Sequence, residues 1–350
     1  MMMGKFAVAA AMAGCGVAGA QSAITVYGNV DAGITYTNNS TVGGGHGAAV
    51  QFMGGGSQGD RIGFRGSEDL GGGTKALFTL ESGFMLANGG PTPGSGGFNR
   101  GSFVGLSGRW GELTLGHQYD FLGWYFPAYA IAANTPAGLL AWSLPAYAAG
   151  GYALDNRVWG ARVSNSVKYL TPTVAGFNAA VQYGFGEIAG SPARKSTADL
   201  VVNYASGPFS ASVAYYSQRN AVNDARKSIA AAGAAYELGP TRLFGMVSDV
   251  RIHDAVGPRA TTLDLGASHL LLPLLRLGGG YQFQWRNNGL GHASQLTASL
   301  DYLLSKRTDV YTVAAFGRDS AFAAQVAPVL GGPSTSGRQV ALRVGIRHRF

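Results

Sequence analysis

The sequence is poor in charged residues, has a single cysteine and lacks any long apolar run. Only 13% of its 350 residues are charged, about half of the density expected on a soluble surface. Beyond residue 21 no stretch offers roughly 18 uncharged residues of helical character, which argues against a helical membrane protein. Hydrophobic residues make up 46% of the chain and argue against disorder, and its 55 glycines lack the three-residue period of collagen.

The few charges present are predominantly basic. Lys and Arg number 26 against 18 Asp and Glu, a formal net charge of +8. Such an excess suits nucleic acid, an anionic surface or the passage of small anions. Charge alone does not choose among these three classes of partner.

The first twenty residues have the composition of an export signal. Lys5 provides a positive start, residues 6–13 are apolar, and Ala18-Gly19-Ala20 is a small-residue cleavage site. We therefore expect residues 1–20 to be a cleaved signal peptide. Alternatively, Met12-Ala13-Gly14-Cys15 forms a lipoprotein box with a lipidated Cys15; otherwise the mature chain contains no cysteine.

The mature chain shows the two-residue period of β-strands. Every second residue from Val26 to Ile34 is apolar or Gly, and the set from Leu275 to Trp285 alternates with polar or small residues that include Arg276 and Gln284. These strands have one apolar face and one face suited to water.

Strand length and aromatic placement decide between a soluble sandwich and a membrane barrel. The alternating segments run for about 10 to 12 residues, longer than typical soluble strands and suited to a tilted bilayer crossing. Aromatic residues end the apolar faces, as in the interfacial girdles of membrane barrels; they are Tyr36, Tyr169, Tyr204, Tyr302 and Phe350. A closed barrel is the sheet that leaves no unpaired edge in lipid, so we predict an all-β, transmembrane antiparallel β-barrel in the outer membrane.

The segments number about sixteen, an even count as such barrels require. The predicted strands are 24–37, 60–69, 74–84, 100–109, 112–119, 162–171, 176–186, 197–206, 209–219, 227–238, 241–252, 260–272, 274–287, 293–304, 307–317 and 337–350. Short links such as Gly207-Pro208 and Gly239-Pro240 are predicted periplasmic turns, and the Gly-rich residues 38–59 are a predicted outer loop.

Several motifs, in order along the mature chain, resemble the trimeric general diffusion porins of beta-proteobacteria. They are ITVYGNVDAGITY, DRIGFRGSEDLGGGTKALFTLESGF, FVGLSGRWGELTLGHQYD, NSVKYLTPTVAGF, LSKRTDVY and RQVALRVGIRHRF. The resemblance implies a sixteen-stranded barrel that is not an enzyme and passes small hydrophilic solutes. It also implies a homotrimer, and Phe350 as the signal read by the outer-membrane assembly machinery.

Alternation in the last predicted strand, 337–350, assigns basic side chains to the inner face. Leu342, Val344 and Ile346 share one parity and are predicted to face lipid. Arg343 has the opposite parity, so its side chain is predicted to face the water-filled interior.

The second and sixth predicted strands alternate in the same way. In the second, Ile62 and Phe64 are predicted to face lipid, which turns Arg61 and Arg65 inward. In the sixth, the lipid side is predicted to hold Val163, Val167 and Tyr169, and the inner side Arg162 and Lys168. These inward basic side chains and Arg343 form the predicted basic wall of the pore.

The resemblance also implies a specific constriction. In anion-selective relatives three arginines converge at the narrowest point, and the motifs DRIGFRG, NRGSFVGL and RVSNSVKY carry these positions over to Arg61, Arg100 and Arg162. A cluster of fixed positive charge in a narrow channel raises the local anion concentration. Alternatively, these arginines only neutralise inward acids, namely Asp31, Glu81 and Glu112.

The longest link between strands is residues 119–157, and residues 121–154 contain no charge. A loop of this length needs a functional reason, and the resemblance implies a third loop that folds into the barrel and narrows it. Related porins place acids there, whereas this loop carries aromatics, predicted to line the eyelet: Trp124, Tyr125, Tyr129 and Trp142. Alternatively, the aromatics pack the loop against the barrel wall.

Motifs for enzymatic chemistry are missing from the sequence. The six histidines lack zinc-site spacing, and there is no GxSxG elbow, P-loop or paired-carboxylate motif. We predict no catalytic residue, no metal, no cofactor and no nucleic-acid partner. Residues 21–350 are expected to form one porin domain whose partners are small hydrophilic solutes, anions and outer-membrane lipids. An outer-membrane barrel enzyme and a structural or adhesin barrel without an open pore are the alternatives.

Overall fold

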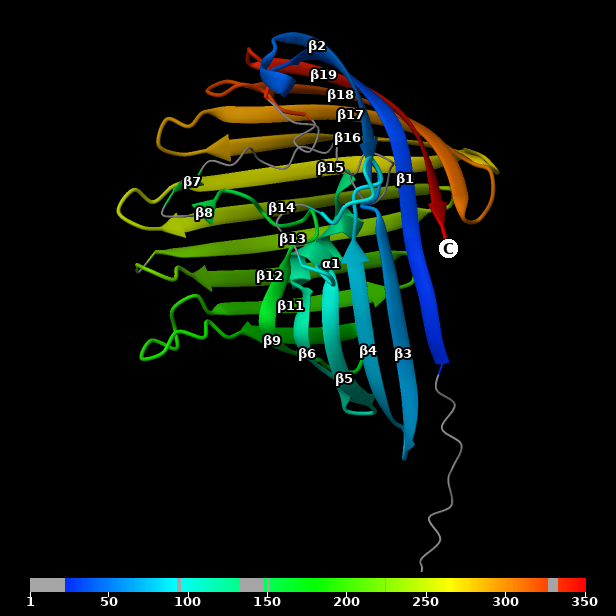
Figure 1. Cartoon of the computed structure of the whole chain (residues 1–350), viewed down its shortest axis with the longest axis vertical. Helices are drawn as coiled ribbons and strands as arrows, with labels where there is room; N and C mark the ends of the chain where they lie inside the picture. The colour runs from blue at the N-terminus through cyan, green and yellow to red at the C-terminus, as the bar shows by residue number, and fades with distance from the viewer. Residues whose placement is uncertain (1–22, 93–95, 132–147, 150–151, 224, 327–332) are drawn as a thin grey trace, which may run out of the picture.

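The computed structural model describes residues 23–92, 96–131, 148–149, 152–223, 225–326 and 333–350. Its dominant feature is one large antiparallel sheet that curves into a barrel (Figure 1). The predicted signal peptide with Cys15, the aromatic Trp142 and the middle of the 119–157 loop lie outside the described residues. In the described part of the chain, no helix is long and apolar enough to cross a membrane.

The strands on the N-terminal side of the barrel are mostly short. They are β1 (Ala23–Ser40), β2 (Gly47–Gly54), β3 (Arg61–Gly71), β4 (Thr74–Gly83), β5 (Gly101–Gly108), β6 (Gly111–Tyr119), β9 (Arg162–Leu170) and β10 (Phe177–Gly184). The remaining strands are β11 (Thr197–Ser206), β12 (Phe209–Arg219), β13 (Arg226–Leu238), β14 (Thr241–His253), β15 (Arg259–Leu272), β16 (Leu275–Arg286), β17 (His292–Leu303), β18 (Thr308–Asp319) and β19 (Arg338–Arg349).

Small elements lie in the long links between these strands. They are the 3-10 helix η1 (Val42–Gly44), the helix α1 (Phe121–Tyr125), the 3-10 helix η2 (Phe126–Tyr129) and the two-residue strands β7 (Ala148–Ala149) and β8 (Tyr152–Ala153).

The barrel closes through sixteen of the seventeen strands of the large sheet. β1 pairs with β19 on one side and with β3 on the other, so the ring has no free edge. The remaining strand, β2, pairs with the C-terminal half of β1. The predicted count of sixteen is confirmed, and the predicted strand ends agree with the observed ones to within about three residues.

The prediction that residues 38–59 form an outer loop is wrong for residues 38–40, which end β1, and for residues 47–54, which form β2. β1 is 18 residues long, and β3 pairs only with its first part, from Ala23 to Asn29. β2 supplies the partner for residues Ala32 to Ser40, because unpaired backbone groups in a membrane wall are costly. The short alternation of Val50 and Phe52 with Gln51 was the signal for this strand in the sequence.

Contacts of the long loop show directly which face of each strand is the inner one. The Tyr129 hydroxyl lies 2.9 Å from Ser212 Oγ of β12, and a Cβ built on Gly233 of β13 would lie 2.5 Å from the Tyr129 ring. The opposite parity of these strands therefore faces outward, where Val213 and Tyr215 are exposed. This agrees with the predicted alternation.

One predicted orientation is wrong. Val163 is 5% exposed and packs in the buried hydrophobic cluster, and it pairs with the buried Gln118 rather than facing lipid. A register shift between β6 and β9 accompanies the positive φ of 51° at Asn165. The extra residue of this bulge reverses the alternation, which no two-residue pattern can anticipate.

Candidate functional site

The first two arginines of the predicted constriction share one carboxylate. Arg100 Nε donates to Glu81 Oε1 at 2.8 Å, and Arg61 Nε lies 3.6 Å from Glu81 Oε2. Glu81 is on β4, Arg61 begins β3, and Arg100 immediately precedes β5, so neighbouring strands bring them together. One acid faces two guanidiniums, which leaves an excess of positive charge.

The third arginine joins this group through a tyrosine. Arg100 Nη2 and Arg162 Nη2 both donate to the Tyr119 hydroxyl, at 2.8 and 2.6 Å. Arg162 Cζ also lies 4.2 Å from the centroid of the Tyr119 ring, a cation–π distance. The structure thus gathers Arg61, Arg100 and Arg162 around Glu81 and Tyr119, and we call these five residues the arginine cluster.

The arginine cluster is partly shielded from water. The side chains of Arg61 and Arg100 are each 20% exposed, and that of Glu81 is 10% exposed. The Tyr27 hydroxyl donates to Glu81 Oε2 at 2.9 Å and holds the carboxylate from a third side. Fixed charges at such partly desolvated positions act through a lower effective dielectric than charges in bulk water.

Arg65 and Lys168 lie beside the cluster in different environments. Arg65 is exposed, with its Cζ 5.2 Å from the centroid of the Tyr27 ring. Lys168 Nζ donates to the Tyr119 carbonyl, and it lies 5.2 Å from the centroid of the Phe121 ring. The Lys168 ammonium therefore holds the start of the long loop.

Arg343 points inward as predicted, but the prediction that it faces water is wrong. Its side chain is fully buried, with Nε 2.9 Å from the Tyr311 hydroxyl and Nη1 3.0 Å from Thr35 Oγ1. Nη2 donates to the Met53 carbonyl at 3.1 Å and lies 3.4 Å from Asp31 Oδ1.

The segment between β2 and β3 is what covers Arg343. The backbone nitrogens of Ser57 and Gln58 donate to Asp31 Oδ2 at 2.7 and 2.9 Å. Gly56 packs so closely on the Arg343 guanidinium that a Cβ at residue 56 would overlap it. Residues 55–60 were predicted to be part of an outer loop, so the sequence offered no sign of this cover.

Replacing Arg343 by Ala should destabilise the barrel without changing its ion selectivity. The substitution leaves the buried Asp31 carboxylate without its cationic partner, at a cost of about 3 to 5 kcal/mol. Urea unfolding followed by tryptophan fluorescence measures the loss, and the reversal potential in planar bilayers measures selectivity. A shifted reversal potential with unchanged stability would instead place Arg343 in the conducting path.

The long loop is anchored by a buried ion pair at its two ends. Arg157 Nε donates to Asp120 Oδ2, and the side chain of Asp120 is fully buried. Asp120 Oδ1 also accepts from Gly123 N at 2.6 Å and caps α1. Burial raises the pKa of Asp120 above its usual range, and Arg157 opposes that rise. Arg157 follows the uncharged residues 121–154, and no pattern in the sequence indicated its role.

From this anchor residues 121–131 run along the wall formed by β11 to β16, and Figure 1 shows α1 inside the barrel. Phe121 N donates to Asp199 Oδ2 of β11 at 2.7 Å. Further along, Arg242 Nη2 of β14 donates to the Ala128 carbonyl at 3.0 Å. The side chain of Ile131 is buried against Gly280 of β16. The described part of the loop is therefore held at successive strands.

The predicted eyelet aromatics divide into different environments. Tyr129 is 5% exposed and packs against the wall, as the alternative interpretation stated. Trp124 is 62% exposed, and its ring centroid lies 5.4 Å from that of Tyr119 in the arginine cluster. Tyr125 is partly buried, which raises the pKa of its hydroxyl.

Among the described residues, no group of three or more His, Cys, Asp or Glu side chains could hold a metal ion. The arrangement that remains is a closed membrane-type barrel with a loop folded inside and basic side chains on its inner face. This combination defines a channel-forming outer-membrane protein.

Comparison with known proteins agrees with this assignment to the channel-forming outer-membrane proteins. Residues 7–321 match the family model described as Gram-negative porin, so the chain belongs to the Gram-negative porin family. Outer membrane porin protein 32 of Delftia acidovorans is 32% identical, covering 97% of this chain and 98% of the relative. An outer membrane porin protein of Bordetella pertussis is 28% identical, covering 98% of each chain. The protein is an outer-membrane porin of the beta-proteobacterial type rather than a membrane enzyme.

Solved structures have the same architecture. The anion-selective porin from Comamonas acidovorans superposes with a TM-score of 0.79 at 28% sequence identity, covering 94% of this chain and all of that one. OmpT of Vibrio cholerae superposes with a TM-score of 0.68 at 12% identity, covering 94% of this chain and 98% of that one, a likeness of fold alone.

Proposed function

We propose that this porin prefers anions and that the arginine cluster is the origin of the preference. The observation that carries the proposal is the charge of the cluster, in which Arg61, Arg100 and Arg162 surround the single acid Glu81. The net positive charge attracts anions and repels cations where the loop approaches the wall. The similar anion-selective porin from Comamonas acidovorans supports the same preference.

Passage is passive in this proposal. Small hydrophilic solutes follow their gradient through the barrel, and the loop between Asp120 and Arg157 narrows the path. Arg65, which is exposed beside Tyr27, extends the basic path beyond the cluster. The exposed Trp124 lines the eyelet beside Tyr119, whereas Tyr129 holds the loop against the wall.

Assembly of the barrel is a further part of the proposal. Phe350 exchanges backbone hydrogen bonds with Gly28, at 3.1 and 3.2 Å, and so joins the two ends of the barrel. We propose that its aromatic ring is recognised by the assembly machinery before it packs over Gly28. We also propose a signal peptide over residues 1–20 and a homotrimer, the latter supported by a trimer form among the structural neighbours.

The test is the reversal potential of the wild-type protein in planar bilayers across a potassium chloride gradient. We expect chloride to permeate better than potassium, by roughly tenfold if the cluster controls the narrowest point. A reversal potential whose sign shows that potassium permeates better than chloride would contradict the proposal.

A further inference from the structure

A second group of basic side chains lies on the outside of the barrel, away from the pore. We call the following residues the outer basic patch: Arg219 on β12, Arg226 on β13, Arg251 and His253 on β14, and Arg259 on β15. The inner faces of β12 to β15 are known from the contacts that the loop makes with Ser212, Gly233, Arg242 and Asp264. The patch residues have the opposite parity, so they face outward.

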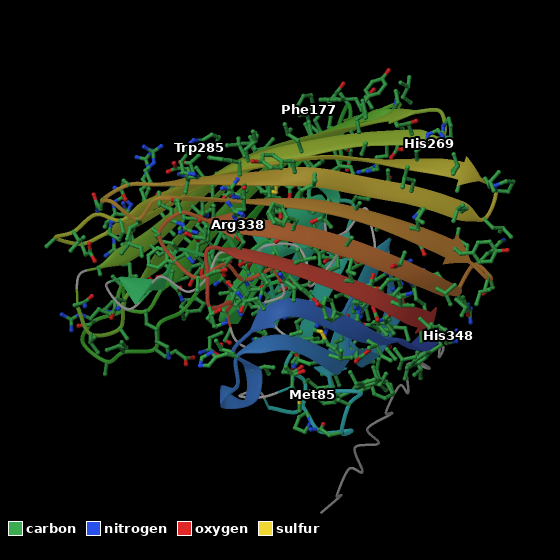
Figure 2. All side chains as sticks on the ribbon, turned by 90° about the horizontal axis from the view of Figure 1, so that it is seen from above. Met85, Phe177, His269, Trp285, Arg338 and His348 are labelled. Atoms are coloured by element: carbon green, nitrogen blue, oxygen red, sulfur yellow. The ribbon has the colours of Figure 1, made fainter. Side chains whose placement is uncertain are left out.

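The patch lies at the end of the barrel that carries the longer loops. The opposite end, with its short turns and Phe350, is the periplasmic one. Trp285 and His269 mark the two ends of this wall in Figure 2. Trp285 is 51% exposed and is the cross-strand partner of Thr261 on β15. Arg259 lies on the same strand, two residues nearer to the outer end of the barrel than Thr261. The patch therefore begins just beyond the aromatic girdle, at the level of outer-leaflet headgroups.

Like charges face each other across neighbouring strands of the patch. Arg219 is the cross-strand partner of Arg226, and Arg251 is that of Arg259. Directly opposed like charges destabilise a sheet unless an anion lies between them. The pair Arg318 and Arg338 repeats the arrangement on β18 and β19.

The acids of the protein only partly compensate this charge. Asp249 accepts from Arg251 Nε at 2.5 Å and from Arg259 Nε at 2.6 Å. It is the only outward acid in strands β12 to β16, all of which the structure describes. Arg219 and Arg226 form no ion pair with any residue that the structure describes. Asp224 lies outside the described residues.

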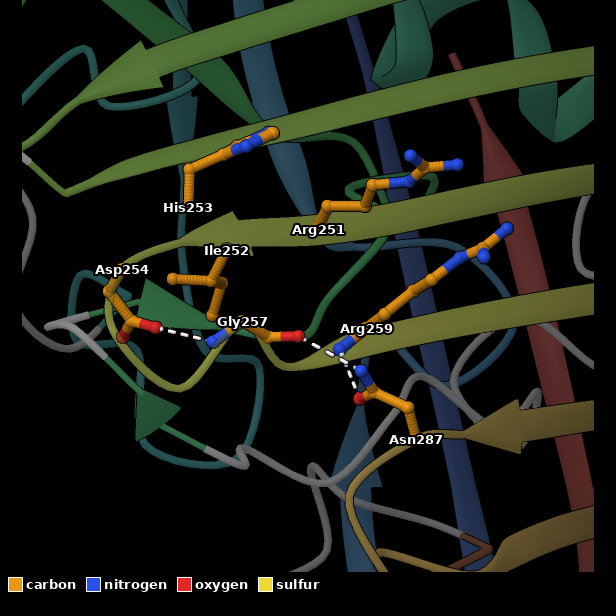
Figure 3. A pocket seen from close by; sticks show the side chains of 7 residues that line it. All are labelled: Arg251, Ile252, His253, Asp254, Gly257, Arg259 and Asn287. Atoms are coloured by element: carbon orange, nitrogen blue, oxygen red, sulfur yellow. Dashed lines mark hydrogen bonds between the residues drawn. The ribbon is translucent and has the colours of Figure 1, made fainter.

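The basic groups border an open depression of about 610 Å³ (Figure 3). Arg251 and Arg259 project side by side from adjacent strands, and their side chains remain 53% and 48% exposed. Asn287 closes one side, where its Oδ1 accepts from Arg259 N at 2.7 Å. His253 Nε2 lies 2.7 Å from Ser228 Oγ on the other side.

We propose that the outer basic patch binds the phosphate groups of an anionic glycolipid in the outer leaflet. Guanidinium groups bind phosphate through paired, charge-assisted hydrogen bonds, and a phosphate would relieve the repulsion between the facing arginines. The acyl chains of the same lipid would lie along the apolar outer wall below, which includes Phe283 and Tyr281. The outward residues at the periplasmic end of these strands include no arginine, so the site belongs to one leaflet.

The experiment measures the affinity of the purified porin for lipopolysaccharide with both lipid A phosphates. The test variant carries Arg219→Ser and Arg226→Ser, and the matched control carries Arg109→Ser and Arg307→Ser in exposed periplasmic turns. We expect affinity to fall roughly 25-fold in the test variant, about fivefold for each arginine, and to stay unchanged in the control.

Two further measurements separate the possible outcomes. The wild type should have a low affinity for glycolipid from which the phosphates have been removed. That affinity should equal the affinity of the test variant for the phosphorylated glycolipid. Equal binding of both lipids, or equal affinities of wild type and test variant, would overturn the proposal. Unchanged single-channel conductance of the test variant verifies its fold, and it separates this lipid site from the proposed anion path.

Discussion

Changing Arg61, Arg100 and Arg162 together to Ser is expected to abolish the preference for anions. The triple variant removes three positive charges and leaves Glu81 without cationic partners within the arginine cluster. The sign of the local potential then reverses, and the ratio of chloride to potassium permeability should fall roughly tenfold or more. Reversal potentials in planar bilayers measure this ratio.

Glu81 provides the matched control for that experiment. Glu81→Gln removes the one acid of the cluster and keeps the size of the side chain and one accepting oxygen, so the preference for anions should increase. High salt should reduce both effects, since mobile ions screen exposed charge over about 8 Å at physiological ionic strength. A triple variant that keeps the wild-type reversal potential would show that the narrowest point lies elsewhere.

The second large effect is expected from Asp120→Asn. The substitution leaves the Arg157 guanidinium, whose side chain is 14% exposed, without its anionic partner. Breaking such a buried pair costs about 3 to 5 kcal/mol. We expect the loop to detach more often from the wall, which should raise single-channel conductance and add current fluctuations. Bilayer recordings measure both, and urea unfolding measures the stability.

Two variants test whether the ion pair is the cause. Asp155 accepts from Arg157 N at 2.9 Å and from Trp159 Nε1 at 2.7 Å. Asp155→Asn keeps one accepting oxygen and leaves the side-chain pair between Asp120 and Arg157 in place, so its effect should be much smaller. Adding Arg157→Met to Asp120→Asn removes the unpaired charge and should restore part of the lost stability. If Asp120→Asn is no noisier than the wild type, the loop is held by its other contacts, such as that between Phe121 and Asp199.

Most of the barrel could be predicted from the sequence because lipid and water on opposite sides impose a two-residue period. Strands 197–206 and 209–219 were predicted to the residue. The period failed at Val163, where the bulge at Asn165 inserts an extra residue. It also missed β2, whose short alternation lies among glycines that indicate a loop.

The candidate site was predictable only in part. Motifs located Arg61, Arg100 and Arg162, and the structure gathers them, but the shared hydroxyl of Tyr119 depends on how the loop leaves β6. Alternation placed Arg343 inside the barrel but could not show that residues 55–60 fold over it. A two-residue period reports the face of a side chain and contains no information on what later covers that face.

The sequence by itself determined the membrane barrel, its approximate strands and the basic character of its interior, because these follow from alternation and composition. Only the tertiary structure decided which basic groups pair with acids, which are buried and which face outward beyond the girdle. Those properties arise between residues far apart in the chain, such as Asp31 and Arg343, and depend on strand register and loop path.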